Sequence, residues 1–264
     1  MPQPSVPAAH GLPFIELQSI DSTNNYALSQ AHAGLAQHGQ AFFAHQQVSG
    51  KGQRGKQWIA EKNSNIILSI LIQPGSLPLS SQFGLSAAVA LAAHDFFSKY
   101  AGSDTTIKWP NDIYWQDRKA GGILIENIIG GKKVADDEEA PAGLSWQWAV
   151  AGIGININQT VFVPGIRNPV SLKQITGKDF DVIKLARQLH ESVIERVNAL
   201  KDGNARSIHE LYVSRLYKKN EIVKLKKDNR VFNAVVKTVS PDGRLIVRHG
   251  IEEAFDWGTV EWVL

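Results

Sequence analysis

The sequence predicts an α+β protein in which a β-sheet with covering helices is followed by a small β-barrel. Residues 65–73 (NIILSILIQ) form an uncharged, β-branched run between turn residues, which is typical of a buried strand. Residues 181–200 repeat apolar side chains at helical spacing and predict an amphipathic helix. From about residue 220 the chain changes to short alternating strands separated by turns such as residues 241–243 (PDG), which predicts the barrel.

The other predicted elements fit the same architecture. The helix N-cap candidates Asp21, Ser22 and Thr23 precede apolar residues that recur at helical spacing as far as Leu35. Residues 81–100 are rich in alanine and long enough for a helix in the core. Further strands are expected at residues 14–17, 40–46, 105–109, 113–115, 120–129 and 144–157, and a last helix at residues 205–217.

The chain is expected to divide into three parts. These are a loose tail at residues 1–13, one large unit at residues 14–217 and the small barrel at residues 218–264. The acidic run at residues 136–139 (DDEE) falls between two predicted strands, so its expected place is a solvated hairpin tip.

Composition and charge exclude several classes of protein. The 28 basic and 25 acidic residues give a net charge of +3, which allows an anionic small ligand but is too weak by itself to indicate nucleic-acid binding. The absence of cysteine excludes disulfides, thiolate metal sites and cysteine nucleophiles. The eight histidines lack metal-ligand spacing, and the chain contains no G-x-S-x-G motif. Prolines and polar residues interrupt the longest uncharged run and the N-terminus lacks a secretory signal, so we expect a cytoplasmic protein.

A glycine-rich basic loop at residues 46–58 (QQVSGKGQRGKQW) is the first candidate site. Its three glycines and its cations can bring backbone N–H groups and positive charge to an anion. The register matches the P-loop pattern G-x-x-x-x-G-K, but Gln57 stands where that motif needs Ser or Thr, and a strand follows instead of a helix. A P-loop is therefore disfavoured, and a mobile surface loop without a site is the main alternative.

The second candidate site is the segment at residues 108–126 (KWPNDIYWQDRKAGGILIE). Lys119 stands at the entrance of a hydrophobic strand, and the glycines at residues 121–122 suggest that something approaches the backbone closely there. Lys119 is therefore a candidate to face an anion in a cleft. The alternative is a hairpin with an exposed lysine, in which Asn111 and Asp112 only form the turn.

The third candidate site is the strand at residues 150–158, in which glycine and isoleucine alternate before two asparagines. Asn156 and Asn158 fall on one face of the strand because its side chains alternate with a period of two. A face of glycines and amides leaves room for a ligand, although a glycine-kinked core strand explains the pattern equally well.

Taken in order, these segments resemble the biotin–protein ligase family. The matching motifs are Ser22-Thr23-Asn24, the loop at residues 46–58, Lys108-Trp109-Pro110-Asn111-Asp112, Lys119-Ala120-Gly121-Gly122-Ile123-Leu124 and Gly152-Ile153-Gly154-Ile155-Asn156. The resemblance extends from about residue 14 to the C-terminus. It is to the monofunctional form, because the chain begins too shortly before Ser22 to hold the DNA-binding domain that some members carry.

The resemblance implies a class II synthetase-like catalytic domain with a mixed β-sheet, followed by an SH3-like barrel. It implies that biotin and ATP, with Mg²⁺, give biotinyl-5′-adenylate, and that biotin then passes to one lysine of a biotin carboxyl carrier protein. A monomer or homodimer is expected, with no DNA and no membrane as partner.

The resemblance also implies a role for each motif. The residues implied for biotin are Ser22, Thr23, Asn24, Gln46, Lys51, Gly52, Gln53, Lys119, Gly121 and Gly122. Those implied for ATP or the adenylate are Arg54, Trp58, Asn111, Lys119 and Asn156, with Trp58 near the adenine as the loop closes. Lys119 and Asp112 are implied as the catalytic residues, and Asp112 also as a magnesium ligand.

The chain departs from the family in the basic loop. The family pattern G-R-G-R reads Gly50-Lys51-Gly52-Gln53 here, with Arg54 next in line to supply a guanidinium. Lysine cannot reproduce the bidentate fork of arginine, so the contact made by each loop residue is expected to differ.

The alternative functions are a lipoate–protein ligase and a non-catalytic biotin or adenylate sensor. The loop and the barrel favour biotin, and the retained Lys119 and Asp112 favour an enzyme.

Overall fold

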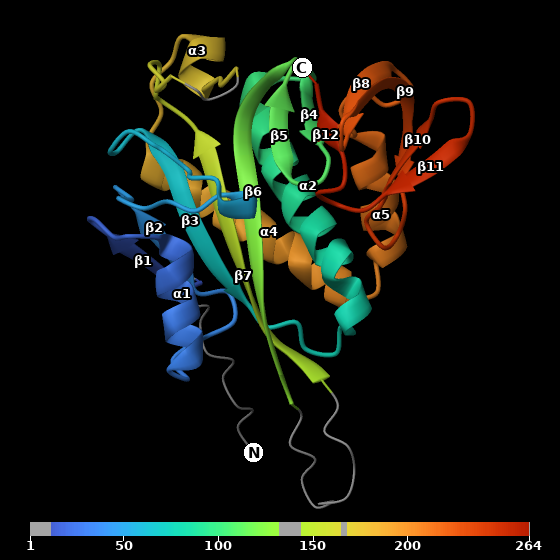
Figure 1. The fold of residues 1–264 in the computed structure, drawn as a ribbon. Helices are drawn as coiled ribbons and strands as arrows, with labels where there is room; N and C mark the ends of the chain where they lie inside the picture. The colour runs from blue at the N-terminus through green and yellow to red at the C-terminus, as the bar shows by residue number, and fades with distance from the viewer. Residues whose placement is uncertain (1–11, 132–143, 165–167, 264) are drawn as a thin grey trace, which may run out of the picture.

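The computed structural model describes residues 12–131, 144–164 and 168–263 (Figure 1). The chain forms two β-sheets with helices packed against the larger one. The strands of the larger sheet are β1 (Phe14–Leu17), β2 (Ala41–Ala44), β3 (Asn65–Ile72), β4 (Thr105–Lys108), β5 (Asp112–Trp115), β6 (Arg118–Gly131) and β7 (Leu144–Asn156). The helices are α1 (Thr23–His32), α2 (Gln82–Ala101), α3 (Leu172–Thr176), α4 (Val182–Lys201) and α5 (Ala205–Ser214), with 3-10 turns at Gln53–Gly55 and Leu79–Ser81.

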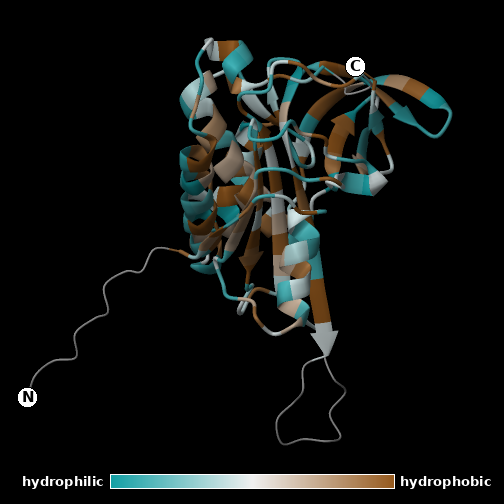
Figure 2. Ribbon diagram, turned by 90° about the vertical axis from the view of Figure 1, so that its left-hand side faces the viewer, coloured by the Kyte–Doolittle hydropathy of each residue, from teal (hydrophilic) through white to brown (hydrophobic). Residues whose placement is uncertain are grey.

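The larger sheet is mixed, as expected from the resemblance. Its strand order is β1-β2-β3-β7-β6-β5-β4, with β1 parallel to β2 and every other neighbour antiparallel. Helices α2 and α4 pack on one face over the main apolar core, and α1 packs on the opposite face over a smaller cluster around Phe42 and Val150 (Figure 1). Strands coloured as hydrophobic lie between these layers (Figure 2).

Helix α1 illustrates how the local sequence sets an element. The Ser22 side chain accepts a hydrogen bond from the Asn25 N–H, so Ser22 is the N-cap, as predicted. The helix ends at His32, and Gly34 follows with a positive φ of 72°. The prediction that the helical face continues to Leu35 was wrong, because Leu35 lies beyond the helix and is 61% exposed.

The C-terminal strands form the second sheet. They are β8 (Ile222–Lys227), β9 (Arg230–Val239), β10 (Leu245–Arg248), β11 (Glu252–Phe255) and β12 (Glu261–Trp262), in the antiparallel order β11-β10-β9-β8-β12. The inner side chains of this sheet join the main core, and the Trp109 indole N–H donates to the Gly243 carbonyl at 2.9 Å. The division at residue 218 into two domains stays a prediction.

One short helix was not predicted from the sequence, and some predicted segments lie outside the described residues. Helix α3 was missed because five residues are too few to show helical periodicity, although Ser171 and Gln174 form a capping box there. Most of the predicted tail and the acidic run at residues 136–139 lie outside the described residues. No helix in the described part of the chain is long and apolar enough to cross a membrane.

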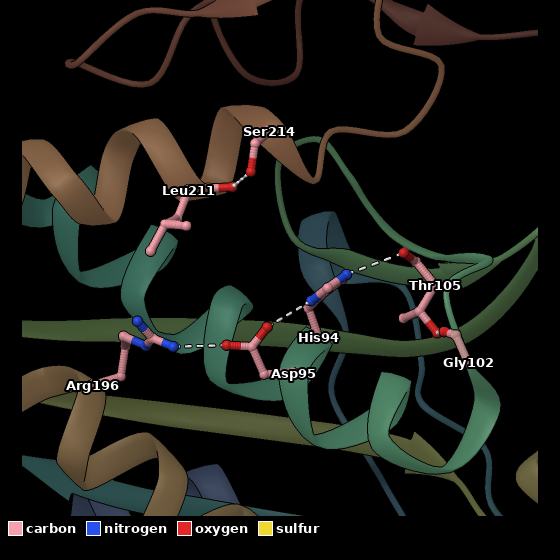
Figure 3. A network of polar contacts seen from close by, with 7 residues as sticks. All are labelled: His94, Asp95, Gly102, Thr105, Arg196, Leu211 and Ser214. Carbon is pink, nitrogen blue, oxygen red and sulfur yellow. Dashed lines mark hydrogen bonds and ion pairs between the residues drawn. The ribbon is translucent and has the colours of Figure 1, made fainter.

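A polar network ties the helices behind the sheet to its edge. His94 on α2 bonds to Asp95 Oδ1 through Nδ1 at 2.9 Å and to the Thr105 carbonyl on β4 through Nε2 at 3.1 Å (Figure 3). Arg196 on α4 donates to Asp95 Oδ2 at 2.7 Å (Figure 3). His94 is buried, so this network fixes α2, α4 and β4 relative to one another.

Candidate active site

Several predicted site residues, among them Asn24, Trp58 and Lys119, gather on the sheet face that carries α1. Gly121 instead faces the main core, where a Cβ would lie 2.5 Å from Ile155 Cδ1. On β7 the α1 face presents Gly152 and Gly154, which pair with Ser69 and Ile67 of β3 on one side and with residues of β6 on the other. Glu126 of β6 pairs with Val150, which belongs to the apolar cluster under α1. The face is therefore lined by glycines at its centre and by polar side chains around them.

A buried polar cluster forms where α1 meets this face. Gln47 Oε1 accepts from the Thr23 N–H at 2.7 Å and lies 3.0 Å from Thr23 Oγ1. Ser69 Oγ lies 2.8 Å from Thr23 Oγ1 and 2.6 Å from Asn24 Oδ1, and Asn24 Nδ2 donates to Glu126 Oε2 at 2.8 Å. The cluster thus brings together β3, β6, the start of α1 and the start of the basic loop.

The number of donor hydrogens in this cluster limits how its side chains can be oriented. Asn24 Oδ1 can only accept, so the single hydroxyl hydrogen of Ser69 is directed to it. Thr23 Oγ1 donates in turn to Gln47 Oε1 at 3.0 Å, so it meets Ser69 Oγ at 2.8 Å as an acceptor that shares the Ser69 hydrogen. The Asn24 amide is held on both its oxygen and its nitrogen, which fixes its orientation toward the sheet face.

The glycines of β7 explain how side chains reach the sheet so closely. A Cβ on Gly152 would lie 2.1 Å from Asn24 Oδ1, and one on Gly154 would lie 2.4 Å from the Trp58 ring. Trp58 therefore lies flat against β7, where its indole nitrogen is buried and bonds to no described residue. Asn24 and Trp58 fill the room that these glycines leave, and the ligand predicted for this face stays a prediction.

Lys119 and Asp112 form an ion pair at the edge of this face. Lys119 Nζ lies 2.6 Å from Asp112 Oδ1, and the two side chains are 30% and 23% exposed. A β-bulge between β5 and β6 turns Lys119 toward Asp112. Tyr114 lies opposite Lys119 but Ile113 lies opposite Gly121, so β6 contains one extra residue at this point. As a result, Lys119 and Gly122 face the same side of the sheet. A Cβ on Gly122 would lie 3.4 Å from Lys119 Nζ, so Gly122 leaves space for the ion pair.

The basic loop is folded back on itself as a small hairpin. Gly52 N–H donates to the Lys56 carbonyl at 2.7 Å, and Lys51 and Gln57 form an antiparallel bridge. Gln53 Nε2 donates to the Ile123 carbonyl of β6 at 3.1 Å, which ties the loop tip to the candidate site. Arg54 adopts a left-handed conformation with φ 56°.

The loop cations take different directions. Lys51 Nζ lies 3.9 Å from Glu126 Oε1 on the site face. The Arg54 guanidinium instead lies beside Gly258 of the C-terminal segment, where a Cβ would be 3.4 Å from Arg54 Cζ. Arg54 therefore connects the loop to the second sheet, and its predicted adenylate contact stays a prediction.

Asn111 and Asn156 both bond to backbone carbonyls. Asn111 Nδ2 donates to the Ile123 carbonyl, and Asn156 Nδ2 donates to the Val170 carbonyl at 3.1 Å. Asn156 is buried and also lies 3.4 Å from the Lys119 carbonyl. These amides hold the backbone at Lys119 and at Ile123 on β6, and the ligand contacts predicted for them stay predictions.

Burial, hydrogen bonds and the charged groups of the site shift the pKa values of two neighbouring side chains. Burial raises the pKa of Tyr212, and the nearby charge of Asp112 adds to this effect. The hydrogen bond from Asn25 lowers the pKa of Asp21, with a smaller contribution from the charge of Lys51. Lys51 therefore stands close enough to both Asp21 and Glu126 to interact with their carboxylates.

The fit of magnesium to these residues is limited. Among the described residues, no group of three His, Asp or Glu side chains converges as a metal site. Asp112 is the predicted ligand, but its Oδ1 is bonded to Lys119. Mg²⁺ held mainly by substrate phosphates needs few protein ligands. The magnesium role of Asp112 stays a prediction.

Sequence reasoning missed three residues of this site. Gln47, one position after the predicted Gln46, supplies the acceptor for Thr23, while Ser69 and Glu126 complete the cluster around Asn24. The two glutamines are adjacent, so sequence alone does not show which one turns toward α1. Ser69 is a polar residue within the apolar run at residues 65–73, which is the signal that could have found it.

Comparison with known proteins shows a similarity to one family and to several ligases. Residues 16–135 match the family described as Biotin/lipoate A/B protein ligase. The chain is therefore similar to this family over that segment. A biotin–acetyl-CoA-carboxylase ligase of Paracoccus denitrificans is 32% identical over 172 residues, covering 62% of this chain and 65% of that protein. The Escherichia coli bifunctional ligase/repressor BirA is 36% identical over 110 residues, covering 42% of this chain. The chain covers 33% to 65% of the length of these relatives.

Solved structures of biotin protein ligases share the fold of this chain. Biotin protein ligase from Aquifex aeolicus in complex with biotin and ATP superposes with a TM-score of 0.77 and 22% identity, covering 95% of this chain and 98% of that one. The Leishmania major enzyme in complex with biotinyl-5-AMP gives a TM-score of 0.59 and 20% identity, covering 92% and 98% of the two chains. The expected mixed sheet with a second C-terminal sheet is thereby confirmed.

Proposed function

We propose that this chain is an ATP-dependent biotin–protein ligase. It would join biotin to AMP and then transfer biotin to one lysine of a biotin carboxyl carrier protein. The observation that carries the proposal is the Lys119–Asp112 pair beside Gly122, on the same sheet face as the buried Thr23–Asn24 cluster. Both curated relatives described above carry the name of a ligase.

The first step would form a mixed anhydride. A biotin carboxylate oxygen attacks the α-phosphorus of ATP, and pyrophosphate leaves. This step brings two anions together, so it needs cations and N–H donors where they meet. Lys119 at the edge of the face and Lys51 in the loop are the cations we assign to that junction, and the polar cluster around Asn24 would hold the head of biotin.

The second step would form the amide bond. The carrier lysine attacks the acyl carbon, AMP leaves, and the amine loses a proton. An amine with an ordinary pKa near ~10.4 is mostly charged at neutral pH, so a carboxylate beside it helps to orient it and to accept the proton. Asp112 is our candidate for this role, because its second carboxylate oxygen remains available when Oδ1 binds Lys119.

ATP would enter with Mg²⁺, and the ion would offset the negative charge of the phosphates. We assign Trp58 and Arg54 to the nucleotide side of the site, because the loop that carries them folds over β6. We place the reaction in the cytoplasm, where ATP is available, and propose no DNA partner.

Pyrophosphate exchange into ATP tests the proposal most directly. We expect exchange with biotin, little with lipoate and none without an acid. Exchange with lipoate alone would establish the lipoate–protein ligase alternative, and binding of biotin without any exchange would establish the sensor alternative. Transfer is then tested by mass spectrometry of a biotin carboxyl carrier domain and of its variant without the acceptor lysine, which should stay unmodified.

A further inference from the structure

Glu126 connects the two parts of the candidate site. Its Oε2 accepts from Asn24 Nδ2 at 2.8 Å, and its Oε1 lies 3.9 Å from Lys51 Nζ in the basic loop. Glu126 lies in the middle of β6, two residues after Leu124, whose carbonyl lies 3.4 Å from Asn24 Nδ2. One carboxylate thus faces the polar cluster with one oxygen and the loop with the other.

Lys51 depends on nearby carboxylates for its direction. Its side chain is 44% exposed, so nothing apolar encloses the ammonium group. Asp21 is the other carboxylate that interacts with Lys51, but its Oδ2 accepts from Asn25 Nδ2 at 2.8 Å. A long lysine side chain retains many rotamers unless a fixed partner selects one, and Glu126 is a fixed partner because Asn24 holds it.

We propose that Glu126 is a positioning residue that aligns the Asn24 amide and holds Lys51 over the site face. Lys51 is then already in place for the carboxylate or phosphate of an anionic ligand. The proposal deepens the proposed function, on which it rests, because it assigns how the loop is aligned with the cluster that would bind biotin. It requires the negative charge of Glu126 as well as its hydrogen-bond acceptor.

Glu126→Gln separates these two requirements. The amide keeps the shape and an oxygen acceptor for Asn24, but it loses the charge that attracts Lys51. Glu210→Gln is the matched control, because Glu210 also pairs with a cation, Arg206, at 2.9 Å but lies on the exposed surface of α5. Both variants remove one negative charge from one ion pair.

The first measurement uses the full chain without ligand, so it does not depend on the proposed activity. Trypsin cleavage after Arg54 and Lys56 should be about two- to fivefold faster in Glu126→Gln than in the unchanged protein, in line with the modest strength of a partly exposed ion pair. Cleavage after Lys227 in the C-terminal sheet should not change, which shows that the variant is folded. A rate equal to that of Glu210→Gln overturns the proposal.

The second measurement is a double-mutant cycle in the pyrophosphate exchange assay. Glu126→Gln should raise the KM for biotin about three- to tenfold and change kcat by less than about twofold. Lys51→Gln should raise the KM at least as much and also lower kcat, because it removes a cation that we assign to the junction of the two anions. The double variant should be no worse than the weaker-binding single variant, because both changes remove the same alignment. If the increase in KM of the double variant equals the product of the two single increases, the two residues act independently and the proposal is overturned. If the unchanged protein shows no biotin-dependent exchange, the proposed function fails, while the trypsin result still tests Glu126 and Lys51.

Discussion

At the scale of single residues, the ion pair between Lys119 and Asp112 makes the sharpest prediction. Lys119→Ala removes the cation at the proposed junction of two anions and should lower biotin-dependent pyrophosphate exchange by at least about 10²-fold. Lys173→Ala is the control, because Lys173 forms a similar ion pair with Asp179 at 2.7 Å on an exposed surface. Unchanged melting temperatures in both variants, with exchange lost only in the first, are the expected result. Wild-type exchange in Lys119→Ala would contradict the assignment.

Asp112→Asn should affect both steps of the reaction. The amide keeps the shape of the turn but loses the charge that holds Lys119, so adenylate formation should slow together with transfer. Transfer from preformed biotinyl-adenylate to a carrier domain, followed in a single turnover, isolates the second step. If only exchange slows, Asp112 acts by holding Lys119; if neither rate changes, Asp112 is only a turn residue.

Two glycines offer a matched test of the close approach at β7. A Cβ would lie 2.1 Å from the Asn24 amide at Gly152 and 2.2 Å from the Gln147 amide at Gly130. Asn24 is buried and bonded on both sides, whereas Gln147 is exposed and can swing away. Gly152→Ala should therefore cost about 1–3 kcal/mol in the free energy of unfolding and weaken biotin binding, while Gly130→Ala should change it by less than about 0.5 kcal/mol. Chemical denaturation and calorimetric titration with biotin measure both effects, and equal behaviour of the two variants would contradict this reading.

At the scale of elements, the basic loop is expected to be a lid. It contains three glycines, and Val48 is 69% exposed, so the loop has little apolar surface of its own to bury. Trypsin should cut after Lys51, Arg54 or Lys56 without ligand, and biotin with ATP should suppress these cuts more than biotin alone. Cleavage after Lys227 in the β8–β9 hairpin should stay constant and serves as the internal control. Equal loop cleavage with and without ligands would show that the loop does not close.

The network between α2, α4 and β4 predicts a pH effect on stability. Burial raises the pKa of Asp95, but the hydrogen bond from His94 and the charges of Arg196 and Arg215 outweigh it, so the pKa is lowered in the folded protein. A lowered folded pKa stabilises the protein above the unfolded value of about 3.9, and this contribution is lost as the pH falls through the folded pKa. Asp95 is 44% exposed, which limits the contribution to about 1 kcal/mol.

Asp95→Asn tests this effect. It should lower the free energy of unfolding at neutral pH, and the difference from the unchanged protein should shrink as the pH falls below about 4. Urea titrations across this range measure it. A difference that stays constant with pH would mean that the charge of Asp95 contributes nothing.

The elements show what sequence reasoning can and cannot reach. The buried strand β3 and the amphipathic helix α4 were predicted because their periodicity is local and long. The bulge that turns Lys119 toward Gly122 was not, because it depends on how two strands pair and not on either strand alone. The same difference holds for the candidate site. Asn24 and Lys119 were predicted because they belong to sequence motifs, whereas Ser69 and Glu126 were not, because only tertiary packing brings them to the site.

At the scale of the whole molecule, Lys108 joins the two sheets. It lies on β4 and is only 7% exposed, and its Nζ donates to Tyr114 Oη at 3.1 Å. The same Nζ lies 5.3 Å from the ring of Trp262 on β12 and 6.0 Å from the ring of Tyr217. A cation enclosed by rings from both sheets stabilises their contact more than an exposed one does, because water screens it less.

Lys108→Met should therefore loosen the C-terminal sheet against the larger one. Methionine fills similar space but loses the charge and the hydrogen bond, and we expect a loss of about 2 kcal/mol in the free energy of unfolding. The matched control is Lys227→Met, because Lys227 Nζ also lies over a ring, Phe255 at 5.1 Å, but its side chain is 45% exposed. That change should cost about 0.5–1 kcal/mol.

Hydrogen exchange should rise in β12 and β8 of Lys108→Met, starting with the Val263 amide that donates to the Lys224 carbonyl. Protection of that amide equal to the control would mean that Lys108 does not hold the two sheets together.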